Sequence, residues 1–186
     1  PPRGAHQQRN VALAIAAAVE LAVSHGLPIT PASIAAGIRQ TRWPARLERI
    51  ASGGAEWILD VAHNPAGAWA LRAGLREALG DTPPHTLIFS CLRDKPVAEM
   101  AQILFPLFEQ VIFAPIHSAR ATPLSDLLAA AESTGTRAFA AESVAQALEW
   151  AAATAGPVVV SGSVYLVGEA RSLLLANAQQ PVGAQP

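Results

Sequence analysis

The chain has 186 residues, 51% of them hydrophobic and only 15% charged, which excludes a disordered protein and allows a substantial core. Its formal net charge of −1 gives no electrostatic reason to expect nucleic acid or an anionic membrane as a partner. A single cysteine, Cys91, excludes an internal disulfide, and no continuous apolar run reaches the roughly 18 residues of a membrane span. We therefore expect a globular, cytoplasmic protein in which Cys91 packs in the core.

The first forty residues predict two helices. Apolar side chains recur at helical spacing over residues 5–25, and Gly26 ends this helix. Thr30 is the expected N-cap of a second helix that ends near Gln40. Because the pair precedes an α/β pattern and the chain does not open with Met, we expect residues 1–41 to be the truncated helical tail of a preceding domain. Without that domain the first helix would expose an apolar face.

From residue 47 onward, short apolar runs alternate with helical segments. The predicted strands are 47–50, 57–61, 86–91, 110–114, 137–140 and 157–161. The predicted helices are 66–79, 96–105, 123–134, 143–153 and 165–175.

This alternation predicts an α/β domain over residues 42–176, with a mostly parallel sheet covered by helices on both faces. Several runs lack polar alternation, as expected for strands that are buried on both faces. The first strand is an exception, because a Gly53-Gly54 turn joins it to the second and favours antiparallel pairing. Residues 177–186, rich in Gln, Pro and Gly, are expected to form a disordered tail.

Polar side chains follow the second predicted strand. Asp60, His63 and Asn64 lie where this strand gives way to a helix, and parallel α/β proteins bind ligands at the carboxyl ends of their strands. A carboxylate there can accept ribose hydroxyls or hold a metal-bound water. The alternative is that one of the three only caps the helix that starts at Pro65. Spacing alone leaves both explanations open.

Two other polar residues also have alternative explanations. Arg46 lies next to the same strand end, where a guanidinium can stack on a base or hold a phosphate. Judged without a family, an ion pair with Glu48 or Glu56 is the favoured explanation. Asn10 lies one turn from His6 on the first helix and offers the donor and acceptor that read an adenine edge, but judged without a family an ordinary polar stripe is the favoured explanation.

Later strands end in polar segments as well. Ser161 and Ser163 flank a glycine at a strand–helix turn, which leaves amides and hydroxyls open to a small anion such as a carboxylate. Asp94 is the expected N-cap of the following helix, Lys95 is beside it, and Arg120 follows the next strand. These loops converge on one edge of the sheet. The sequence lacks the Gly-x-Gly-x-x-Gly fingerprint, so NAD and FAD are not proposed.

Taken together, these segments resemble the C-terminal domain of the Mur ligase superfamily, and most closely its folylpolyglutamate synthase/dihydrofolate synthase branch. In chain order the matching segments are His-Gln-Gln-Arg-Asn at 6–10, Trp-Pro-Ala-Arg-Leu-Glu at 43–48, Leu-Asp-Val-Ala-His-Asn-Pro at 59–65, Asp-Lys at 94–95 and Ser-Gly-Ser-Val-Tyr-Leu-Val-Gly-Glu at 161–169. The resemblance covers roughly residues 5 to 175 and implies a Rossmann-like α/β fold. One departure is Ala45, where the family usually has glycine.

The resemblance implies ATP-dependent amide ligation. In such a reaction ATP and Mg²⁺ phosphorylate the carboxylate of dihydropteroate or a folate, and the amino group of L-glutamate then displaces phosphate. The positions that match ATP contacts are Asn10, Arg46 and Asp60. The positions that match glutamate contacts are His63, Ser161 and Ser163, with Asn64, Lys95 and Arg120 as further rim residues.

The resemblance also implies a missing part. The sequence has no Gly-x-x-x-x-Gly-Lys-[Ser/Thr] P-loop, and in the family this loop, the Mg²⁺ ligands and most of the folate site belong to the preceding domain. Alone, the chain is expected to be inactive and, as in most of the family, monomeric. Two alternatives stay open: another Mur-type ligase with a different acceptor, and a non-catalytic α/β module that binds a nucleotide or an amino acid.

Overall fold

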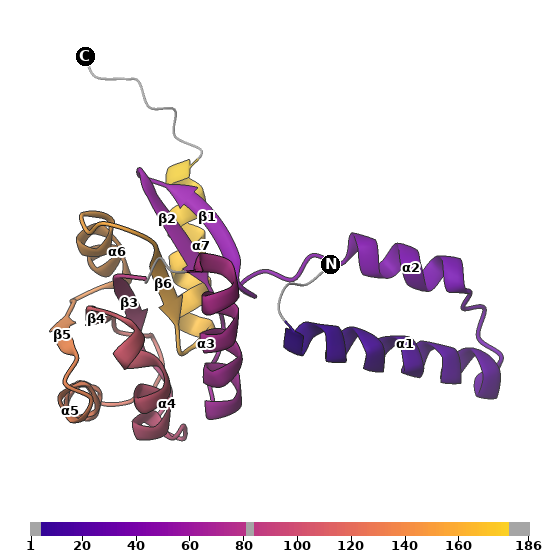
Figure 1. Cartoon of the computed structure of the whole chain (residues 1–186), viewed down its shortest axis with the longest axis horizontal. Helices are drawn as coiled ribbons and strands as arrows, with labels where there is room; N and C mark the ends of the chain where they lie inside the picture. The colour runs from indigo at the N-terminus through magenta and orange to yellow at the C-terminus, as the bar shows by residue number, and fades with distance from the viewer. Residues whose placement is uncertain (1–4, 81–83, 179–186) are drawn as a thin grey trace, which may run out of the picture.

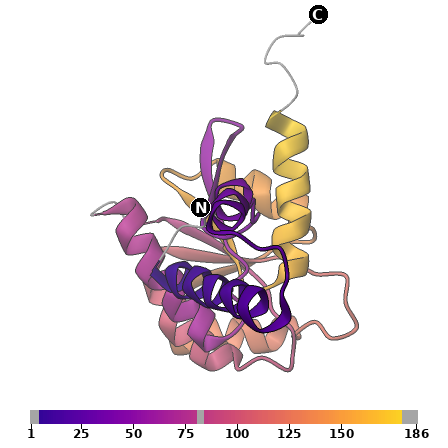
Figure 2. The ribbon, with the colours of Figure 1, turned by 90° about the vertical axis from the view of Figure 1, so that its right-hand side faces the viewer.

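The computed structural model describes residues 5–80 and 84–178 (Figure 1). Its first two helices, α1 (Ala5–His25) and α2 (Pro31–Gln40), lie together to one side of the α/β body. The view turned by 90° shows this pair on the side of the body where α1 meets α3 (Pro65–Leu79) (Figure 2). As expected, Thr30 caps α2: its hydroxyl accepts a hydrogen bond from the backbone N–H of Ser33 at 3.1 Å.

A six-stranded sheet forms the centre of the α/β body. Its strands are β1 (Glu48–Ser52), β2 (Ala55–Leu59), β3 (Thr86–Phe89), β4 (Gln110–Phe113), β5 (Arg137–Ala140) and β6 (Val158–Ser161). Their order across the sheet is β1-β2-β6-β3-β4-β5. The pairs from β2 to β5 are all parallel, whereas β1 pairs antiparallel with β2, with Glu48 opposite Leu59. Both sequence predictions about the sheet are therefore confirmed.

Helices cover both faces of the sheet, and successive strand residues alternate between them. Val159 of β6 joins the core under α3, α4 (Val97–Leu104) and α5 (Leu124–Ser133). Its neighbours Val158 and Val160 join the core under α6 (Val144–Ala152) and α7 (Val164–Ala178). A short 3₁₀ helix, η1 (Phe105–Leu107), follows α4. The predicted fold class is confirmed, and this topology gathers the carboxyl ends of the parallel strands along one edge.

Two details of the chain ends and core test the sequence predictions. Asn177 and Ala178 are the last residues of α7, so the predicted disorder is wrong for these two, and residues 179–186 lie outside the described residues. Cys91 is fully buried as predicted, and burial, the largest effect on its thiol, raises its pKa. Among the described helices, none combines the length and the apolar character that a membrane crossing requires.

Candidate functional site

Arg46 lies in a turn of unusual backbone conformation, residues 45–47, here called the Arg46 turn. Ala45 has φ 56° and Leu47 has φ 49°, in the left-handed region that L residues rarely adopt and that costs about 1–2 kcal/mol per residue. A glycine at position 45 would adopt this conformation without that cost. Contacts elsewhere in the fold must therefore hold the turn.

Backbone hydrogen bonds fix both strained residues. The Ala45 N–H donates to Glu48 Oε2 at 2.8 Å, and the Ala45 carbonyl accepts from the Val61 N–H at 3.0 Å. The Leu47 N–H donates to Asp60 Oδ2 at 3.0 Å. The turn is thus joined to the end of β2 on one side and to the first residue of β1 on the other.

A glycine of α3 makes room for the side chain that follows Arg46. The Leu47 side chain is buried, and a Cβ placed on Gly74 would come within 2.4 Å of its Cδ1 atom. Gly74 could not be recognised from the sequence, because a glycine inside an otherwise helical pattern does not reveal which side chain packs on it.

Asp60 is buried, with an exposed fraction of 4%, and both of its carboxylate oxygens accept backbone hydrogen bonds. Oδ2 accepts from Leu47, and Oδ1 accepts from the Ala62 N–H at 2.9 Å. The helix cap is instead Asn64, whose Oδ1 accepts from the Gly67 N–H at 2.8 Å. His63 turns back, with its Nδ1 atom 2.8 Å from the Val61 carbonyl.

Arg46 makes neither of the two ion pairs that its sequence context favoured. Glu48 pairs with Arg171, and Glu56 pairs with Arg49. The Arg46 Nε atom is buried and has no hydrogen-bond partner within the part of the chain that the structure describes. The guanidinium carbon lies 5.6 Å from the ring centroid of Trp43, in cation–π range.

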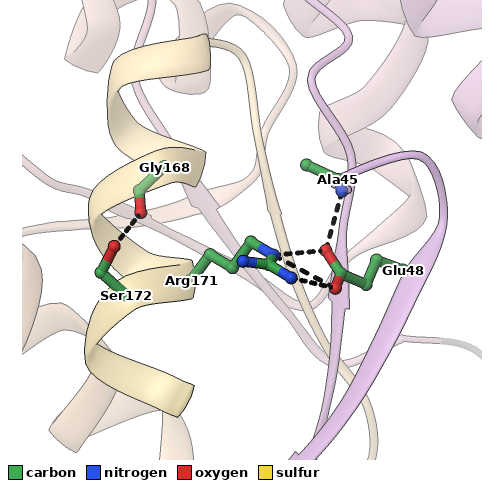
Figure 3. Close-up of polar contacts among 5 residues, drawn as sticks. All are labelled: Ala45, Glu48, Gly168, Arg171 and Ser172. Carbon is green, nitrogen blue, oxygen red and sulfur yellow. Dashed lines mark hydrogen bonds and ion pairs between the residues drawn. The ribbon is translucent and has the colours of Figure 1, made fainter. Parts of the chain in front are cut away.

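Glu48 and Arg171 form a two-pronged ion pair between β1 and α7 (Figure 3). The Arg171 Nε atom donates to Glu48 Oε2 at 2.9 Å, and Nη2 donates to Oε1 at 3.0 Å. Burial, the largest single effect, would raise the pKa of Glu48, but the hydrogen bonds from Arg171 and from the Ala45 amide together lower it below its ordinary value. The same pair raises the pKa of Arg171. Arg171 could not be recognised from the sequence, because nothing near it in the chain indicates a partner 123 residues away.

A pocket of about 220 Å³ opens at the carboxyl edge of the sheet, and we call it the edge pocket. It is lined by His63, Leu92, Lys95, Arg120, Gly162, Ser163, Val164 and Tyr165. Four predicted site residues, each from a different loop, therefore meet here: His63, Lys95, Arg120 and Ser163. Ser161 does not line the pocket: its side chain is fully buried, and its hydroxyl donates to the Ala62 carbonyl at 3.4 Å.

Asp94 holds the two cations of the edge pocket. Its predicted role as an N-cap is wrong, because α4 begins after Pro96 with no side-chain cap. Instead, Asp94 Oδ2 accepts from Lys95 Nζ at 3.0 Å, and Oδ1 accepts from Arg120 Nη2 at 2.8 Å. These contacts, that of Lys95 first, lower the pKa of Asp94. A backbone bond from the Arg93 N–H to the Arg120 carbonyl, at 2.8 Å, joins the two loops.

Gly162 forms part of the pocket wall and cannot be replaced without a clash. It has φ 102°, and a Cβ there would come within 2.4 Å of the Ser90 carbonyl oxygen. Its N–H donates to the Ala62 carbonyl at 3.0 Å, which places Ser163 at the start of α7.

Asn10 is not among the residues that line the edge pocket or form the Arg46 turn. Its amide donates to Gln7 Oε1 at 3.1 Å on α1. A larger cavity, of about 490 Å³, lies along the C-terminal half of α3 between Trp69 and Leu107, and it contains none of the predicted site residues. Within the described residues, no group of three or more His, Cys, Asp and Glu side chains could hold a metal ion.

Comparison with known proteins decides the family. Residues 45–164 match the model described as "Mur ligase, glutamate ligase domain". The chain belongs to this family. It is 35% identical over 178 residues to folylpolyglutamate synthase of Lacticaseibacillus casei, a match that covers 95% of this chain and 40% of that protein. It is 34% identical over 193 residues to dihydrofolate synthase/folylpolyglutamate synthase of Mycobacterium tuberculosis, covering 93% of this chain and 39% of that protein.

The solved structures give the same relationship. Mycobacterium tuberculosis folylpolyglutamate synthase, crystallised with ADP and AMPPCP, superimposes with a TM-score of 0.79 at 32% identity. That match covers 100% of this chain and 42% of the solved chain. The chain thus spans about 40% of the length of its relatives from Lacticaseibacillus casei, Bacillus subtilis and Mycobacterium tuberculosis.

Proposed function

We propose that this chain is the C-terminal part of an ATP-dependent ligase that adds L-glutamate to dihydropteroate, to a folate, or to both. Family membership and the names of its relatives support ligase chemistry on folates. The observation that carries the proposal is the Arg46 turn, in which a strained backbone presents a buried guanidinium nitrogen without a partner among the described residues.

A buried polar group that lacks a hydrogen bond destabilises a protein by about 1–3 kcal/mol, and more when it is charged. A bound anion at Arg46 would remove this penalty, and a guanidinium suits phosphate better than any other side chain does. Arg46 therefore contacts a phosphate group of ATP in our proposal. Asp60 fixes the turn through Leu47. In our proposal Asp60 also accepts a ribose hydroxyl, and Asn10 of α1 contacts the adenine.

The edge pocket receives L-glutamate in this proposal. At about 220 Å³ it lies below the roughly 300–1,000 Å³ of sites for drug-sized ligands, as suits an amino acid. Lys95 and Arg120 bring two positive charges against the single negative charge of Asp94, so the cluster has one excess positive charge, which complements the net negative charge of L-glutamate. Ser163 and His63 line the same pocket and offer further polar contacts, and Asn64, the cap of α3, is the next residue after His63.

The remaining parts of the enzyme belong to a P-loop domain in our proposal. The exposed apolar side chains of α1, among them Ile15 at 37% and Val19 at 48% exposure, would pack against that domain. Mg²⁺ accompanies ATP in phosphoryl transfer, and we expect its ligands in the same domain. Residues 42–176 would then close over the nucleotide and present glutamate to the acyl phosphate.

The test is a ligase assay on the full-length product of the gene that encodes this chain. Phosphate release is measured as a function of ATP, Mg²⁺ and glutamate, with dihydropteroate or tetrahydrofolate as the acceptor. We expect turnover that requires one or both pterins and that falls at least about a hundredfold in the Arg46→Ala variant, as when one stabilising donor is removed from a transition state. Arg49→Ala, which removes an exposed arginine of the same hairpin, is the matched control.

The acceptor decides between the alternatives. Turnover with another carboxylic acid but with neither pterin would keep the ligase and exclude folate. If no acceptor supports turnover while nucleotide still binds, the chain belongs to a binding module and the proposal is wrong.

A further inference from the structure

The Glu48 carboxylate serves two partners at once. One oxygen, Oε2, accepts both from the Ala45 amide at 2.8 Å and from Arg171 Nε at 2.9 Å, while Oε1 accepts from Arg171 Nη2 at 3.0 Å. Figure 3 shows this arrangement, with Arg171 reaching from α7 to the carboxylate that holds the Arg46 turn. An ion pair between two distant elements is thereby coupled to the backbone of a strained residue.

A second ion pair, within the β1–β2 hairpin, serves as a comparison for the pair of Glu48 and Arg171. Arg49 and Glu56 join β1 to β2, their side chains are 40% and 39% exposed, and neither side chain is hydrogen-bonded to the main chain of the described residues. Glu48 and Arg171 are less exposed, at 24% and 33%. Their pair reaches a main-chain amide one residue from Arg46.

The other end of the connection lies at the edge pocket. Arg171 belongs to α7, and α7 begins at Val164, directly after Ser163 in the pocket wall. The chain of contacts from Ser163 through α7, Arg171 and Glu48 to Ala45 therefore joins the edge pocket to the Arg46 turn.

We propose that Glu48, held by Arg171, is a positioning residue that fixes the direction of the Arg46 side chain relative to the edge pocket. The proposal rests on the proposed function, in which Arg46 contacts ATP. Without the carboxylate, the Ala45 amide loses its acceptor, and the left-handed conformation of Ala45 is held only from its carbonyl side. Small displacements of a substrate-positioning group lower turnover strongly, because the reacting atoms must meet within about 3–3.5 Å.

The experiment uses variants of the full-length gene product, assayed for the KM for ATP, the KM for glutamate, kcat and the melting temperature. Arg171→Met should lower kcat/KM for ATP about tenfold, a change of about 1.4 kcal/mol. Arg171→Lys, which keeps the charge but not the planar fork, should recover part of this loss. Arg49→Met, the matched control, should leave kcat/KM for ATP unchanged.

The exchange Glu48→Arg with Arg171→Glu separates positioning from stability. It restores an ion pair between β1 and α7, so the melting temperature should recover relative to Arg171→Met. The Ala45 amide would then face a guanidinium instead of an acceptor, so kcat/KM for ATP should stay low. Recovery of both quantities would overturn the proposal, because the ion pair alone would then suffice. If the exchanged protein does not fold, the comparison of Arg171→Lys with Arg171→Met still tests whether kcat/KM for ATP depends on the planar fork of Arg171.

Arg46→Ala, measured in parallel, distinguishes this proposal from the proposed function. If this variant keeps wild-type kinetics with ATP, the role of Arg46 in the proposed function is wrong. If it loses activity while Arg171→Met keeps wild-type kcat/KM for ATP, only the positioning role of Glu48 and Arg171 is overturned.

Discussion

The Arg46 turn and the edge pocket hold their cations in opposite ways. In the Arg46 turn the neighbouring groups are bonded to one another, and the Arg46 Nε atom has no hydrogen-bond partner among the described residues. In the edge pocket, Lys95 and Arg120 are both paired with Asp94 at 3.0 and 2.8 Å. One region presents a guanidinium whose Nε atom is unpaired within the described residues, on a strained backbone, and the other presents two cations that share one carboxylate.

This difference indicates how each region would treat a ligand. An anion at Arg46 gains a partner that forms no ion pair with a carboxylate of the described residues, on a backbone that is already fixed. A carboxylate in the edge pocket joins an existing network and competes with Asp94 for the same donors. We therefore expect tight anion binding at Arg46 and weaker, more selective binding in the edge pocket.

Gly162→Ala should disrupt the comparison most severely, because it acts on the wall of the edge pocket. A Cβ at φ 102° and 2.4 Å from the Ser90 carbonyl oxygen adds backbone strain to a clash with the main chain. We expect the free energy of unfolding to fall by about 3 kcal/mol or more, measured by urea denaturation. Gly135→Ala is the control, since Gly135 has φ 67° but no atom within 4 Å, and it should lose only about 1 kcal/mol. Equal losses in the two variants would contradict the close packing at Gly162.

Lys95→Met should sharpen the comparison, because it should change the KM of one substrate only. Removal of this charge from the edge pocket should raise the KM for L-glutamate about tenfold, or about 1.4 kcal/mol, and leave the KM for ATP unchanged. Steady-state kinetics on the full-length gene product measure both values. Arg93→Met is the control, because Arg93 is an exposed cation of the same loop that does not line the pocket. A rise in the KM for ATP of similar size would show that the two regions do not bind separate substrates.

Acid should weaken the Arg46 turn through Glu48. The folded chain lowers the pKa of Glu48, so between the folded and the ordinary pKa the unfolded chain binds more protons. The contribution of Glu48 to the free energy of unfolding is therefore complete above the ordinary pKa. It is lost as the pH falls through the pKa that Glu48 has in the folded chain. The difference in free energy of unfolding between the wild type and Glu48→Gln, measured at a series of pH values, should shrink on acidification. A difference that does not change with pH would contradict the lowered pKa.

Ala45→Gly should have the smallest effect and the opposite sign. Relief of the left-handed alanine raises the free energy of unfolding by about 1–2 kcal/mol. The greater freedom of glycine in the unfolded chain lowers it by about 0.4–1 kcal/mol. We expect a net stabilisation of about 0.5 kcal/mol in urea denaturation. Ala51→Gly, in the exposed part of strand β1, should instead destabilise the chain. Destabilisation by both variants would argue against the strained turn.

The sequence predicted most of what depends on local pattern. The alternation of apolar runs predicted the strands of the sheet, and the Gly53-Gly54 turn predicted the antiparallel edge. The capping residues Thr30 and Asn64 were among the predicted candidates because a cap lies three residues from the amide that it accepts.

Contacts between distant segments were beyond the reach of sequence pattern. Asp94 failed as a cap because Arg120, 26 residues later, provides a charged partner. Arg46 lost its expected partner because Arg171, on the last described helix, holds Glu48. The chain's topology created both pairs, and a single sequence does not show which side chains it brings together.

The affinity of the full-length gene product for ADP tests the central claim most directly. Isothermal titration with the wild type, Arg46→Ala and Arg49→Ala compares the unpaired cation with an exposed arginine of the same hairpin. We predict that Arg46→Ala weakens binding at least about tenfold and does not lower the melting temperature, because Arg46 Nε makes no hydrogen bond within the described residues. Equal affinities for ADP in all three proteins would contradict the account, because Arg46 would then not contact the nucleotide.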